Sequence, residues 1–185
     1  MLRYRFLDLP RGGPVDDMAM VWQEGDRPRV VHILIPSLRE GVRQRLHRHP
    51  GAVAGHDPQI DGLCHQIRRY LAGEVVDLAI DLLDAGMCTP FQWRVLMAEK
   101  SIPRGEVRAY GQVALMAGRP GGARAAGNAL GRNPFPIVIP CHRAVRSDGS
   151  LGGYLGGLPM KRALLELEGV QFDARGRVAQ MRPGG

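Results

Sequence analysis

The sequence has no long apolar run, few cysteines and almost no lysine. No stretch approaches the roughly 18 apolar residues of a membrane-spanning helix, and Met1–Phe6 lacks the apolar core and cleavage site of a signal peptide. Three widely spaced cysteines, Cys64, Cys88 and Cys141, fit neither a disulfide framework nor a zinc site. We therefore expect a cytoplasmic protein with no membrane partner, no bound metal and no cofactor.

Acidic residues are scarce in the second half of the chain. Residues 1–86 hold 11 Lys and Arg against 12 Asp and Glu, whereas residues 87–185 hold 14 against 6. A local basic excess of this size attracts polyanions, with nucleic acid as the first candidate. Because 23 of the 25 basic residues are arginine, a highly soluble, arginine-rich surface is the simpler alternative.

The first half of the chain is typical of a small α/β domain. Met18–Trp22 and Arg29–Ile35 are strand candidates on either side of a turn-like segment. Apolar residues at helical spacing predict a helix over 60–71, and the loose alternation over 75–83 predicts an extended segment. The sequence therefore predicts an N-terminal domain over 1–86 with a small sheet and a helix.

The second half is expected to be mainly helical. Thr89–Gln92 is a helix start, in which the threonine caps, the proline takes the first helical position and the glutamine completes a capping box. Segments 111–117 and 121–130 are separated by glycine and proline, which is typical of the turn in a helix-turn-helix. We expect a C-terminal domain over 87–172, followed by a flexible tail over 173–185.

A short apolar run closed by two prolines leads directly to a Cys-His pair. Ile137–Ile139 is β-branched, too short for a helix and enclosed by Pro136 and Pro140, so it predicts a brief buried strand. Cys141 then follows a rigid element, beside an imidazole and a guanidinium that favour thiolate over thiol. A core cysteine next to a surface histidine is the simpler alternative.

This constellation resembles the active-site signature of the O(6)-alkylguanine-DNA alkyltransferases, also called methylated-DNA–protein-cysteine methyltransferases. The resemblance covers roughly residues 89–169 and agrees in order and spacing. The segments that carry it are Thr89–Gln92, Ile102–Gly105, Tyr110, Ala123–Ala125, Gly131–Pro134, Ile137–Arg143, Gly153–Gly157 and Leu164–Gly169.

The resemblance implies a suicide repair protein. One alkyl group, typically methyl, would pass from the guanine oxygen-6 of double-stranded DNA to Cys141, without turnover. His142 would accept the thiol proton, and Glu168 would orient the imidazole. This role gives a reason for a carboxylate at a helix C-terminus, where the helix dipole disfavours an anion. Tyr110 would serve the ring nitrogen of the leaving guanine, and Asn133 would join the helix pair to the site.

The resemblance also implies DNA contacts and a pocket. The target base must be flipped out of the stacked duplex, and Arg124 would fill the gap. The expected DNA contacts are Ala123, Arg124, Arg132 and Arg143. The expected pocket residues are Leu130, Ala144, Leu151, Tyr154 and Leu155. Some relatives carry a hydroxyl residue where Leu155 stands, which leaves the preferred alkyl group open.

Three other functions are weighed against this one. A non-catalytic alkylated-DNA-binding protein of the alkyltransferase-like type would lack a reactive cysteine, so Cys141 favours the enzyme. A transcription regulator would need more base-reading side chains than Arg124 and Asn128. A cysteine hydrolase would need a distant histidine and an oxyanion hole, and the sequence identifies neither. We expect the protein to act as a monomer.

Overall fold

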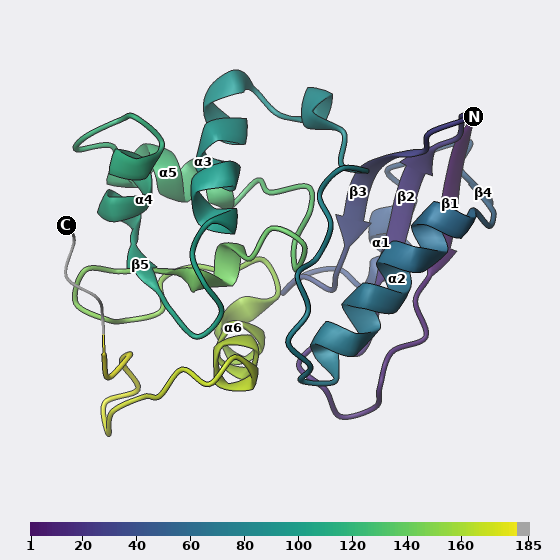
Figure 1. Ribbon diagram of the computed structural model, residues 1–185. Coiled ribbons are helices and arrows are strands. Elements are labelled where there is room, and N and C mark those ends of the chain that lie inside the picture. Colours follow the sequence, from purple (N-terminus) through teal and green to yellow (C-terminus); the bar gives the residue numbers. More distant parts are fainter. Residues whose placement is uncertain (181–185) are drawn as a thin grey trace. The chain divides into compact units, whose positions relative to one another are not determined.

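The computed structural model describes residues 1–180, which form two compact units (Figure 1). Unit 1 contains residues 1–87 and 134–138, and unit 2 contains residues 88–133 and the chain from Ile139 onward. The chain therefore leaves unit 2, passes once through unit 1 and returns. The domain boundary that the sequence predicts near residue 86 does not include this second passage, in which residues 134–138 belong to unit 1. Within the described residues, no helix has the length and apolar character needed to cross a membrane.

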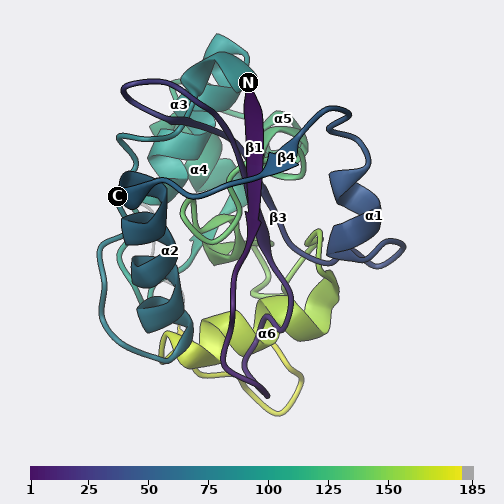
Figure 2. The ribbon, with the colours of Figure 1, turned by 90° about the vertical axis from the view of Figure 1, so that its right-hand side faces the viewer.

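Unit 1 is built on a small mixed sheet. Its strands, in the spatial order β3-β2-β1-β4, are β1 (Leu2–Phe6), β2 (Ala19–Gln23), β3 (Arg29–Leu34) and β4 (Val53–Ala54). β2 is antiparallel to both β1 and β3, and β4 is parallel to β1. Helices α1 (Val42–Leu46) and α2 (Pro58–Leu71) cover opposite faces of this sheet (Figure 2).

The predictions for unit 1 are partly confirmed. Both expected strands and the helix over 60–71 are present, and Cys64 lies on the buried face of α2. Residues 75–83 form no strand, and only Leu83 makes an isolated bridge, to Val30. Asp57 caps α2 by accepting hydrogen bonds from the backbone N–H groups of the first turn.

Unit 2 is mainly helical. Its helices are α3 (Pro90–Lys100), α4 (Tyr110–Met116), α5 (Ala123–Leu130) and α6 (Gly157–Leu167). α3, α4 and α5 pack against one another. A two-stranded parallel pair, β5 (Arg108–Ala109) and β6 (Ala144–Val145), links the start of α4 to the chain just after the Cys-His pair. Residues 1–180 thus hold a small mixed sheet and six α-helices.

The start of α3 agrees with the prediction from the sequence, except for the role of the Gln92 side chain. The Thr89 hydroxyl accepts from the backbone N–H of Gln92, and Pro90 occupies the first helical turn, as expected. The Gln92 side chain does not complete a capping box. Its amide donates instead to the carbonyls of Ala129 and Arg132, at 3.2 and 2.9 Å. Carbonyls at a helix C-terminus lack partners within their own helix, so Gln92 joins α3 to the end of α5.

Residues 173–180 are packed, in contrast to the expected flexible tail. The backbone N–H of Val178 donates to the Gly149 carbonyl, and that of Ala179 to the Gln171 carbonyl. Val178 is buried in an apolar cluster of unit 2, with Val107, Val145, Leu151, Leu165 and Val170. The rest of the predicted tail, 181–185, lies outside the described residues. The charged and glycine-rich composition predicts a flexible tail, but Val178 holds this segment in the apolar cluster.

Candidate active site

The segment that leads to the Cys-His pair is a turn, so the expected strand over Ile137–Ile139 is wrong. Ile137 adopts a φ of +74° although it is β-branched and fully buried, a conformation that costs about 1–2 kcal/mol. Pro136 and Pro140 carry no N–H, so the segment cannot pair on both sides like an inner strand. The Ile139 carbonyl accepts from the Asn133 side chain at 3.1 Å and from the Cys141 N–H at 2.8 Å.

Cys141 and His142 lie in a short helical turn, η2 (Cys141–Arg143), and both are buried. The imidazole Nε2 lies 3.1 Å from Oε1 of Glu168, which caps the C-terminus of α6. This confirms that the fold brings the predicted histidine and carboxylate together across 26 positions of sequence.

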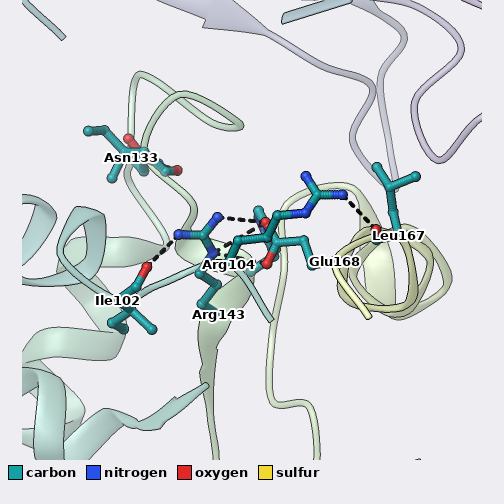
Figure 3. Close-up of polar contacts among 8 residues, drawn as sticks. Ile102, Arg104, Asn133, Arg143, Leu167 and Glu168 are labelled. Atoms are coloured by element: carbon teal, nitrogen blue, oxygen red, sulfur yellow. Dashed lines mark hydrogen bonds and ion pairs between the residues drawn. The ribbon is translucent and has the colours of Figure 1, made fainter. Parts of the chain in front are cut away.

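Arg143 holds the same carboxylate. Its Nη2 donates to Oε1 of Glu168 at 2.7 Å and its Nε to Oε2 at 2.9 Å, a two-point contact (Figure 3). A further donor reaches the Ile102 carbonyl, and the neighbouring Arg104 donates to the Leu167 carbonyl at 2.7 Å. The Arg143 side chain is 11% exposed. The guanidinium therefore neutralises Glu168 instead of facing a phosphate, which corrects the expected DNA contact.

These contacts fix the charges of Glu168 and His142. Burial acts to raise the pKa of Glu168, but the hydrogen bond from His142 and the hydrogen bonds and charge of Arg143 outweigh it, so the pKa lies well below its usual range. Burial lowers the pKa of His142 despite the carboxylate beside it. The pair is therefore an ionised Glu168 and a neutral imidazole. Since a carboxylate only accepts, Nε2 carries the proton and Nδ1 is the acceptor nitrogen.

Cys141 is a thiol at rest. Burial raises its pKa to about 11, against a hydrogen bond from Asn133 that lowers it. The expectation that the neighbouring imidazole and guanidinium favour thiolate at rest is therefore wrong. The physical reason is burial, which has the largest effect on the pKa of Cys141. In addition, the imidazole is neutral and the guanidinium charge is already matched by Glu168. A reaction at this sulfur needs the proton to leave as the new bond forms.

Tyr110 and a lysine that the sequence did not single out lie on another side of the site. Burial raises the pKa of Tyr110 to about 12, so its phenol keeps its proton. Its hydroxyl lies 3.4 Å from the Gly153 carbonyl and 3.5 Å from Nζ of Lys161. Lys161 is fully buried. A Cβ on Gly152 would lie 2.8 Å from the Tyr110 hydroxyl, so only glycine fits there.

The remaining predicted residues fall into two groups. Of the expected pocket, the Tyr154 ring meets His142 edge-on at 6.5 Å, Leu155 is half-buried, and three residues are buried: Leu130, Ala144 and Leu151. Of the expected DNA contacts, Ala123 and Arg124 are exposed on α5, and Arg132 is exposed just after it. The predicted pocket residues are thus buried or half-buried, whereas Ala123, Arg124 and Arg132 lie on the surface of α5 and just after it.

Unit 2 thus holds a buried cysteine together with a neutral imidazole that can accept a proton and a protonated phenol. The family model described as "6-O-methylguanine DNA methyltransferase, DNA binding domain" matches residues 90–170. A methylated-DNA–protein-cysteine methyltransferase of Methanothermobacter thermautotrophicus is 44% identical over 162 residues, covering 88% of this chain and 85% of the relative. The chain belongs to the family of methylated-DNA–protein-cysteine methyltransferases.

Two further relatives span most of the chain. The methylated-DNA–protein-cysteine methyltransferase of Mycolicibacterium paratuberculosis is 38% identical over 169 residues, covering 91% of this chain and 93% of the relative. The crystal structure of Mycobacterium tuberculosis OGT in complex with DNA has a TM-score of 0.71 and 36% identity, covering 90% of this chain and 93% of that chain. The family likeness therefore includes unit 1 as well as unit 2.

Replacing Glu168 by glutamine should lower the free energy of unfolding by about 3 kcal/mol at pH 7, because Arg143 is left buried without its anion. The pKa of Glu168 is lowered in the folded state. Its contribution is therefore fully present above an unfolded pKa of about 4.3 and is lost as pH falls below it. Urea unfolding at pH 7 and at pH 4 measures both effects.

Glu166→Gln is the matched control, since Glu166 forms a half-exposed pair with Arg162 on the same helix. Such a pair contributes about 0.5 kcal/mol or less. Equal losses in the two variants at pH 7 would show that the buried pair of Arg143 and Glu168 stabilises the fold no more than a surface pair does.

Proposed function

We propose that Cys141 accepts the alkyl group in the DNA repair reaction of this family. The thiolate sulfur attacks the alkyl carbon on the guanine oxygen-6, a carbon–sulfur bond forms, and the carbon–oxygen bond breaks with its electrons going to the base. The product is a stable thioether, so each molecule reacts once. The observation that carries the proposal is the buried Cys141 beside a neutral His142 held by an ionised Glu168.

The thiol proton passes to His142 as the sulfur attacks. With Nε2 directed at Glu168, Nδ1 is the basic nitrogen. The imidazolium that forms is stabilised by the Glu168 carboxylate, which Arg143 keeps ionised and in place. Asn133 supports the same step, because its hydrogen bond lowers the pKa of the Cys141 thiol and its side chain holds the Ile139 carbonyl.

The leaving guanine needs a proton on its ring nitrogen, and Tyr110 is the donor we propose. A phenol with a pKa raised to about 12 is protonated at neutral pH, and a donated proton avoids expelling a guanine anion. Leu130, Leu151, Tyr154 and Leu155 would enclose the base, and the half-buried Leu155 offers no hydroxyl to the guanine oxygen.

We propose double-stranded DNA with an alkylated guanine as the substrate, and α4 and α5 as the helix-turn-helix that binds it. The turn between them holds Gly118 and Gly121, both at positive φ. Beside it lies a shallow depression of about 460 Å³, lined by Arg119, Pro120, Gly121, Gly122, Arg124, Ala125 and Asn128. Small side chains at this surface allow close approach to a DNA groove, and a relative solved in complex with DNA supports the assignment.

We propose that the chain consists of an N-terminal α/β domain and a C-terminal DNA-binding alkyltransferase domain. We further propose that the protein acts as a monomer, since every side chain assigned to the reaction comes from one copy of unit 2. Unit 1 has no assigned chemical step.

Cys141→Ser should abolish alkyl transfer to the protein while leaving DNA binding within about twofold, because a hydroxyl is far less acidic and less nucleophilic than a thiol. Transfer is followed with radiolabelled methylguanine DNA, and binding with an unreactive duplex of the same sequence. Cys64→Ser changes a cysteine on α2 of unit 1 and should keep full transfer. Label on the Cys141→Ser variant would show that another residue is the acceptor.

Arg124→Ala should slow repair of duplex DNA at least tenfold, with a smaller effect on the free alkylated base, because only the duplex requires a flipped base. Arg11→Ala removes an equal charge from an exposed position of unit 1 and serves as the control. Single-turnover rates on both substrates make the comparison. Equal slowing on duplex and free base would show that Arg124 supports the fold instead.

A further inference from the structure

The sheet face under α1 carries two aromatic rings that the proposed function does not use. Tyr4 and Phe6 stand at alternate positions of β1, so both side chains lie on one face of the sheet. They pack against the apolar cluster that contains Val42 of α1. Because α1 has only five residues, it covers part of this face (Figure 2), and both aromatic residues remain half-buried. Unit 1 therefore presents aromatic surface beside α1.

An open depression of about 370 Å³ lies at these rings, and we call it the β1–α1 depression. Its lining comes from β1, α1, β4 and the residues after β4, and consists of Tyr4, Arg5, Phe6, Arg43, Ala54, Gly55 and His56. The charge of Arg5 is matched by Asp61. The guanidinium of Arg43 lies 4.8 Å from the centre of the Phe6 ring, and no carboxylate within residues 1–180 pairs with it. The depression thus combines aromatic rings with one uncompensated cation.

The positive charge of unit 1 is concentrated in and around α1. Residues 39–48 hold four arginines and one acidic residue, whereas residues 1–86 together hold 11 basic and 12 acidic residues. The one acid, Glu40, pairs with Arg48. The three other arginines of this segment form no ion pair within residues 1–180. Because the rest of residues 1–86 is acidic on balance, an anionic ligand of unit 1 is drawn to α1.

Aromatic rings beside uncompensated arginine are the features that bind single-stranded nucleic acid. Unpaired bases stack on aromatic rings or on guanidinium planes, while basic side chains follow the phosphates. A duplex keeps its bases stacked inside and offers base edges and phosphates instead, so it has no free ring face for Tyr4. The volume of the depression is near the lower end of the range for ligand sites, about 300 to 1,000 Å³, which suits one nucleotide unit.

We propose that the β1–α1 depression binds one nucleotide of a single DNA strand. The base stacks on the ring of Tyr4, and the guanidinium of Arg43 meets the adjoining phosphate. Phe6 holds this guanidinium at its ring, so the charge is in place before the strand binds. These residues belong to unit 1, whereas the proposed alkyl transfer uses side chains of unit 2. The inference therefore goes beyond the proposed function and gives unit 1 a binding role.

Photo-crosslinking of the full chain to a hexathymidylate that carries one 5-bromodeoxyuridine locates the site. Peptide mass spectrometry should find the crosslink on the peptide that contains Tyr4. Tyr4→Leu keeps an apolar side chain but removes the ring, and it should weaken hexathymidylate binding about tenfold, the loss expected for one base–aromatic stack. Crosslinks confined to residues of unit 2, or unchanged affinity of Tyr4→Leu, would overturn the proposal.

Arg43→Gln is the second variant, and it changes an exposed side chain, so it tests the site should Tyr4→Leu fold poorly. It should make the plot of log affinity for hexathymidylate against log salt concentration shallower by about 0.7, the contribution of one phosphate contact on a single strand. Arg11→Gln removes an equal charge from an exposed position outside the depression and should leave this slope unchanged. Equal changes of slope in the two variants would mean that net charge alone matters, against the proposal.

Binding to an unreactive DNA duplex provides the comparison between the two kinds of strand. The loss of affinity caused by Tyr4→Leu should be at least fivefold larger on hexathymidylate than on the duplex, because only the single strand offers a free base to the ring. Equal losses on both probes would show that the depression does not recognise unpaired bases, and the proposal would fail.

Discussion

The bidentate contact between Arg143 and Glu168 is the interaction on which the rest of the site depends. Together with the hydrogen bond from His142, it keeps a carboxylate ionised in a buried position where it would otherwise take up a proton. An ionised Glu168 fixes the tautomer of His142. That tautomer leaves Nδ1 as the acceptor nitrogen, which in the proposed mechanism takes the proton of Cys141. The same contact matches the charge of Arg143, so the guanidinium does not activate the sulfur directly.

Burial gives this site a cysteine that is inert at rest. A thiol with a pKa of about 11 reacts slowly with adventitious electrophiles at neutral pH, which suits a residue that is used once. The buried groups around it can stabilise negative charge when an alkylated base arrives: Asn133 by a hydrogen bond and Lys161 by its charge. In the proposed mechanism, reactivity is therefore coupled to the presence of the substrate, because the proton leaves as the carbon–sulfur bond forms.

Local patterns predicted the helices, because capping and glycine punctuation act over short distances. The Cys-His-Glu constellation was predicted from the family resemblance. Long-range burial was not predictable in this way. The sequence predicted Arg143 as a DNA contact and did not single out Glu99, yet one is buried against Glu168 and the other has no solvent contact. The turn at Ile137 was missed for a similar reason, since a β-branched residue at positive φ is tolerated only when surrounding packing enforces it.

We propose that Cys141 is used up when it takes the alkyl group from DNA. Mass spectrometry of the intact protein and of its peptides, after incubation with duplex DNA containing O(6)-methylguanine, tests this proposal. We expect a mass gain of one methyl group per molecule, located on the peptide that contains Cys141 and saturating at one equivalent. An unchanged protein mass with intact DNA binding, or a methyl group on Cys64 or Cys88, would contradict it.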